Sequence, residues 1–190
     1  MSDTAILKSA GKPRLSFKIQ TAAAISAIIG AVALPQIFHM LGMVSGLGTV
    51  PGEVFLPMHI PVIIAGLLAG PYAGLVSGLI GPAVSFLLCG MPGAAMLPFM
   101  MVELCGYGLM AGLLRNVKMP CILKVLAVQV FGRAVRACAI LAAVYVFGSQ
   151  TVNAAVIWTS IATGLIGLVL QWVLIPLLVY YVEGKMKYDK

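Results

Sequence analysis

Residues 98–124 read PFMMVELCGYGLMAGLLRNVKMPCILK, and this stretch contains the two features that decide the fold. Its first part, residues 98–114, is apolar apart from Glu103 and is long enough for most of a membrane-spanning helix. Its second part, from Arg115 to Lys124, holds three basic residues. Short loops that stay in the cytoplasm keep Lys and Arg, so the stretch predicts a helix that runs inward to a cytoplasmic turn.

The same charge bias extends over the whole chain. Ten of the twelve Lys and Arg residues lie in that turn or near the two termini, namely Lys8, Lys12, Arg14, Lys18, Arg115, Lys118, Lys124, Lys185, Lys187 and Lys190. The other two, Arg133 and Arg136, lie inside an apolar run, and the remaining connections carry none. The bias predicts that both termini face the cytoplasm and that the number of spans is even.

The composition excludes an ordinary soluble domain. The chain is 62% hydrophobic, has a mean hydropathy of +1.10 and is only 9% charged, whereas a soluble domain is about 25% charged. Its net charge of +7 is compatible with nucleic acid, but the basic residues flank apolar segments and therefore indicate topology and contacts with anionic lipid. The four cysteines are isolated in sequence, which favours packing roles over metal or disulfide chemistry.

These patterns predict an all-α integral membrane protein with a single membrane domain over residues 1–190. The expected spans cover about 17–41, 58–70, 72–88, 98–114, 122–147 and 154–182, with outer loops at 42–57 and 89–97. Gly70-Pro71 separates the second and third spans. A single broken helix there is the alternative, but it would give five spans and place the C-terminal lysines outside.

Three charged residues interrupt the apolar spans: Glu103, Arg133 and Arg136. An ionisable group in the bilayer costs several kcal/mol, so it normally faces a partner or a wet cavity. At a rise of about 1.5 Å per residue, Glu103 lies about 8–13 Å and Arg136 about 16 Å from the outer ends of their spans. The two side chains are therefore expected to meet, either as an ion pair that joins two helices or as the polar floor of a solute site.

Other residues suggest binding less specifically. His59 opens the second span, where it is either a helix-end hydrogen bonder or a ligand contact, and it has no second His or Cys nearby to form a metal site. Methionines gather at the outer ends of the spans and suit an adaptable apolar surface or plain packing; they are Met40, Met43, Met58, Met91, Met96, Met100 and Met101. Gln129 and Gln171 are interpreted as contacts between helices.

Ala23, Ala27 and Ala31 follow one another at a spacing of four on the first span. Small residues at this spacing let another helix approach closely, whether that helix belongs to a partner or to the same bundle. The sequence has no G-x-x-x-x-G-K-[ST], H-E-x-x-H or G-x-S-x-G motif, so we do not expect an enzyme, and no cofactor is predicted.

The chain resembles the substrate-binding membrane subunit, or S component, of an energy-coupling-factor (ECF) vitamin importer. The resemblance covers most of residues 17–182 and includes the alanine ridge of the first span. Two segments, LPMHIPVIIAGLLAGP (56–71) and LPFMMVELCGYGLMAG (97–112), are similar to the riboflavin/pantothenate-type branch.

The resemblance implies a pocket near the outer face, built from spans four to six and capped by the two outer loops. The candidate substrate-binding residues are Glu103, Arg136, His59, Met96, Met100, Tyr107, Arg133 and Trp158. The resemblance also implies docking through Ala23, Ala27 and Ala31 onto a transmembrane coupling subunit in a bacterial plasma membrane. That coupling subunit would work with two ATPase subunits. ATP hydrolysis would then be done by these partners.

The expected substrate is a water-soluble vitamin, with pantothenate favoured because an arginine suits a carboxylate and Glu103 can accept hydroxyl donors. Three alternatives remain. The chain could be a stand-alone ion-coupled secondary transporter in which Glu103 binds the ion, an assembly subunit that binds no solute, or an enzyme of membrane lipids.

Overall fold

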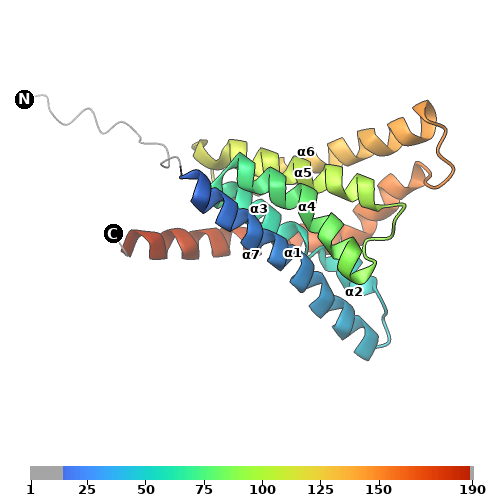
Figure 1. Cartoon of the computed structure of the whole chain (residues 1–190), viewed down its shortest axis with the longest axis horizontal. Coiled ribbons are helices and arrows are strands. Elements are labelled where there is room, and N and C mark those ends of the chain that lie inside the picture. Colours follow the sequence, from blue (N-terminus) through green and yellow to red (C-terminus); the bar gives the residue numbers. More distant parts are fainter. Residues whose placement is uncertain (1–14, 189–190) are drawn as a thin grey trace, which may run out of the picture.

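The computed structural model describes residues 15–188. Lys8, Lys12, Arg14 and Lys190, which contribute to the predicted charge bias, lie outside the described residues. The chain forms α1 (Phe17–Val44), α2 (Val50–Phe55), α3 (His59–Ala69), α4 (Pro71–Cys89), α5 (Leu97–Leu113), a 3₁₀ turn η1 (Leu114–Asn116), α6 (Cys121–Leu141), a π-helical turn η2 (Ala142–Val146) and α7 (Ala155–Tyr188) (Figure 1).

The predicted all-α fold with six spans is confirmed. Between residues 15 and 188 there is no strand, and six helical segments are long and apolar enough to cross a membrane. One of them, Val50–Ala69, combines α2 and α3, and another, Cys121–Val146, combines α6 and η2. The expected outer loop after the first span therefore contains a short helix, α2, that continues into the second span.

The connections separate the molecule into two ends (Figure 1). The start of α1, the α3–α4 turn, the α5–α6 turn and the end of α7 lie together, and we call this the basic end because it carries Lys18, Arg115, Lys118, Lys124 and Lys185. The α1–α2, α4–α5 and α6–α7 connections lie at the opposite end, which we call the loop end.

The second and third spans are separate helices that reverse direction at Gly70. Gly70 has a φ of 114°, a conformation that favours glycine, and Pro71 then starts α4. Gly66 and Gly74, which lie four residues to either side of this turn, both approach the backbone of Gly108 on α5. A side chain at Gly74 would overlap Gly108, so these glycines allow the close helix contacts typical of membrane bundles.

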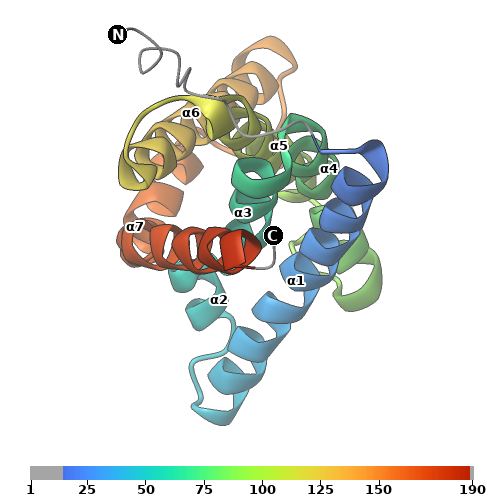
Figure 2. The same ribbon diagram turned by 90° about the vertical axis from the view of Figure 1, so that its left-hand side faces the viewer.

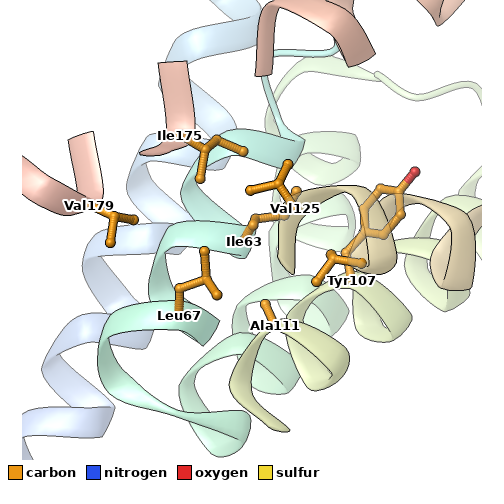
Figure 3. Packing of buried hydrophobic residues seen from close by; sticks show 8 residues of the cluster. Ile63, Leu67, Tyr107, Ala111, Val125, Ile175 and Val179 are labelled. Atoms are coloured by element: carbon orange, nitrogen blue, oxygen red, sulfur yellow. The ribbon is translucent and has the colours of Figure 1, made fainter. Parts of the chain in front are cut away.

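The packed core lies towards the basic end. Seen from that end, α3 is near the centre, with α1, α4, α5, α6 and α7 around it (Figure 2). Side chains from α3, α5, α6 and α7 interlock there (Figure 3); the cluster contains Ile63, Leu67, Tyr107, Ala111, Val125, Val128, Ile175 and Val179. The loop end contains a smaller buried cluster of Phe99, Ile140 and Val152 and, beside it, a cavity.

Candidate functional site

A buried cluster of charged side chains joins α5 to α6. Glu103 of α5 is fully buried, and its Oε2 accepts a hydrogen bond of 2.8 Å from Nη1 of Arg136 on α6. Nη1 of Arg133 lies 3.2 Å from the other carboxylate oxygen, Oε1. The contact between Glu103 and Arg136 that helical depth predicts is therefore present.

Two further side chains surround the same carboxylate. The Tyr107 hydroxyl donates to Oε1 of Glu103 at 3.0 Å, because Tyr107 stands one turn further along α5. His59, at the start of α3, is buried and its Nε2 lies 3.8 Å from the same oxygen. Gly132 of α6 lies directly against the Tyr107 ring, and a side chain at that position would overlap it. Glycine at position 132 thus allows α6 to approach α5.

The cluster has more positive than negative charge. The side chains of Arg133 and Arg136 are 10% and 13% exposed, and both guanidinium groups face the carboxylate of Glu103. One positive charge is therefore in surplus even when His59 is neutral. Among the described residues, all three guanidinium nitrogens of Arg133 and Nε of Arg136 lack a hydrogen-bond partner of good geometry. Buried donors without partners are costly, and an anion beside the cluster would balance its surplus charge.

These two arginines line a cavity of about 460 Å³ at the loop end, within the size range of small-molecule sites. One wall is apolar and consists of Met58, Met91, Met96 and Met100. Polar groups come from α1, α4 and α7, namely His39, Ser85, Thr159, Ser160 and Thr163. Glu53 of α2 lies at its exposed side.

The structure brings most of the candidate binding residues together. His59, Met96, Met100, Arg133 and Arg136 line the cavity. Glu103 and Tyr107 are not among the lining residues; Glu103 holds the two arginines, and Tyr107 donates to Glu103.

Trp158 is not part of this group. Its side chain is 75% exposed and it is not among the residues that line the cavity. Ser160, which does line it, is about 200° around the helix from Trp158 at 3.6 residues per turn. Trp158 therefore faces outward from α7.

The hydroxyl groups in the cavity wall were not predicted from the sequence. Thr159 and Thr163 are four residues apart and share a face near the start of the sixth span, which is a recognisable signal in a segment otherwise apolar. Ser85 of α4 is fully buried, and its hydroxyl has no hydrogen-bond partner in the described part of the chain. An isolated serine in an apolar span gives no comparable signal. Across residues 15–188, no three His, Cys, Asp or Glu side chains form a group that could hold a metal ion.

The alanines of α1 lie against the protein's own bundle. Ala27 is 6% exposed and packs with alanines of α3 and α4, while Ala31 is fully buried beside Val62 and Leu104. Ala23 is half-buried at the edge of the same cluster. In this arrangement the ridge provides close internal packing, which was one of the two interpretations of the alanine spacing.

Comparison with known proteins gives the family. A family model described as the substrate-specific component of ECF transporters matches residues 17–179. The search of the curated proteins and the search of the solved structures found no match. The match covers all six spans up to the last part of α7. This multi-pass membrane protein therefore belongs to the family of ECF transporter substrate-specific components, which are the substrate-binding, non-catalytic subunits of these importers.

Proposed function

We propose that this subunit captures a small, singly charged carboxylate vitamin, pantothenate, in the loop-end cavity. The observation that carries the proposal is the surplus positive charge of the buried cluster, where the cavity-lining Arg133 and Arg136 face the carboxylate of Glu103, while the other carboxylate at the cavity, Glu53, is exposed. A monoanion in the cavity would neutralise the surplus charge of the two guanidinium groups.

The rest of the wall supports this choice within the vitamin class. Pantothenate carries an amide, two hydroxyls and a geminal dimethyl group besides its carboxylate. The hydroxyls of Thr159, Ser160 and Thr163 can bond the polar groups, and the methionines suit the methyl groups. No Phe, Tyr or Trp is among the described residues that line the cavity, which disfavours a ligand held by ring stacking, such as riboflavin.

The charge bias supports an orientation and a set of partners. With the basic end in the cytoplasm of a bacterial cell, both termini face inward and the cavity opens outward. The subunit would then deliver its ligand with a transmembrane coupling subunit and two ATPase subunits, which hydrolyse the ATP. Docking through Ala23, Ala27 and Ala31 would require α1 to move from its internal packing.

A matched pair of ligands tests the substrate. The purified chain is heated with pantothenate or with panthenol, in which an alcohol replaces the carboxylate. A ligand at about 100 times its Kd stabilises the folded state by about 2.7 kcal/mol, so pantothenate should raise the melting temperature clearly, and panthenol should raise it far less. Equal shifts would refute recognition of the carboxylate, and no shift with pantothenate would refute the substrate.

A further inference from the structure

A chain of buried amide groups connects α6 and α7 outside the cavity. Nε2 of Gln129 donates to the Leu168 carbonyl at 3.2 Å and to Oε1 of Gln171 at 3.1 Å. Oε1 of Gln129 accepts a hydrogen bond of 2.6 Å from the Trp172 indole. Both glutamines are buried, and polar groups at such a depth need internal partners because lipid supplies none.

This amide chain ends at the wall of the cavity. Nε2 of Gln171 donates at 3.3 Å to the carbonyl of Leu56, which is 115 positions away in sequence. The same carbonyl accepts a hydrogen bond of 3.2 Å from the backbone N–H of His59. Leu56 has a φ of 50°, which lies in the left-handed region that residues other than glycine rarely adopt. The α2–α3 turn therefore needs stabilising contacts from other parts of the chain.

Two glycines of α7 provide the surface on which this turn sits. A side chain at Gly167 would come within 2.7 Å of the Phe55 carbonyl carbon, and one at Gly164 would lie 2.8 Å from the Leu56 side chain and 3.0 Å from a guanidinium nitrogen of Arg133. Gly164, Gly167 and Gln171 are three and four residues apart, so they share one face of α7.

We propose that Gln171 is a positioning residue of the substrate site. It holds the Leu56 carbonyl against α7 and thereby sets the positions of Leu56, Met58 and His59 in the cavity. Gly167 assists because it lets the turn rest directly on the helix. The expected change in pantothenate affinity rests on the proposed function, whereas the expected effect on the α2–α3 turn does not.

Three variants separate positioning from general packing. Gln171→Met removes the bond to Leu56, and Gly167→Ala displaces the same turn without touching the amides. Trp172→Phe is the control, because it removes the indole hydrogen bond to Gln129 from the same network but leaves both hydrogen bonds of the Gln171 side chain in place. Each variant is reconstituted in lipid nanodiscs. Amide hydrogen exchange of residues 56–60 is then measured without ligand, and pantothenate affinity is measured by calorimetry.

We expect exchange at the His59 N–H to rise at least tenfold, and Kd to rise at least tenfold, in Gln171→Met and Gly167→Ala. Both quantities should stay within twofold of the wild type in Trp172→Phe. Unchanged exchange in the first two variants would overturn the proposal, as would an equal rise in the control. Faster exchange with unchanged Kd would overturn the link to the site. If the wild type binds no pantothenate, the proposed substrate is refuted. The exchange data alone then decide whether Gln171 holds the turn.

Discussion

At the scale of residues, the Glu103 carboxylate is the centre around which the arginines are arranged. Its two oxygens bond Arg136 and Tyr107 and attract Arg133, while it lies just behind the cavity wall. Removing one partner from a buried ion pair is strongly destabilising because the other charge is left uncompensated. Loss of Arg136 should therefore lower the stability of the protein more than loss of Arg133. Of the two arginines, only Arg136 makes a well-formed hydrogen bond to Glu103 in the described structure.

Replacing Arg136 by Ala is expected to weaken pantothenate binding at least tenfold, or about 1.4 kcal/mol, and also to lower the melting temperature. Arg133→Ala should weaken binding to a similar extent with a smaller loss of stability, because it leaves the Arg136–Glu103 bond in place. Calorimetry and thermal denaturation of both variants give the comparison. Unchanged affinity with reduced stability in both would assign the arginines a purely structural role.

Glu103→Gln provides the opposite change at the same position. It removes the negative charge and leaves two buried guanidinium groups facing each other, so we expect a lower melting temperature without ligand. The preference for pantothenate over panthenol should persist, because both arginines remain. A variant that no longer prefers the carboxylate would show that Glu103 is needed to position the arginines.

At the scale of elements, α1 shows how the same small residues can serve two purposes. The ridge of Ala27 and Ala31 brings α1 close to α3 and α4. Its opposite side exposes Ile25, Ile29 and Ile37, as expected for a helix in contact with lipid. Helices in lipid associate through close packing of small residues rather than through burial of apolar surface.

Ala27→Leu should lower the melting temperature of the isolated subunit, since overpacking a buried position costs about 1–3 kcal/mol. Ala33→Leu is the control on the same helix, at an exposed position, and should leave the melting temperature unchanged. Co-purification with the coupling subunit is measured for both. An unchanged melting temperature with loss of the complex in Ala27→Leu would instead support docking through the alanine ridge.

In the molecule as a whole, the largest buried cluster and the cavity occupy different parts of the helix bundle. The interlocked core joins α3, α5, α6 and α7 (Figure 3), and the cavity lies among α2, the α2–α3 turn, the α4–α5 connection and the first turns of α7. This division fits a subunit that receives solute at one face and keeps its shape through the other.

Single-cysteine labelling tests the proposed orientation. Cys89 is exposed at the loop end and should react with a membrane-impermeant maleimide in intact cells, after the other three cysteines are replaced by Ser. Lys118→Cys, in a chain without native cysteines, should react only after permeabilisation. The reverse pattern would place the cavity on the cytoplasmic side.

The number of the spans, the reversal at Gly70 and the meeting of Glu103 with Arg136 were predictable from sequence, whereas α2 within the expected outer loop at 42–57 was not. Each depends on a local property, namely apolar length, glycine and proline chemistry, or helical rise. The family resemblance was likewise present in residues 17–179. The specific residues that line the cavity were only partly predictable.

Only the tertiary structure decided which faces of the helices turn inward. It directed Thr159, Ser160 and Thr163 into the cavity and Trp158 outward, buried the alanines of α1, and joined Gln171 to Leu56. The physical reason is that lipid is as apolar as a neighbouring helix, so α7 is apolar on nearly all sides and its sequence pattern does not mark one face. The positions of the helices and of their charges thus follow from local sequence, and the site follows from how the helices pack together.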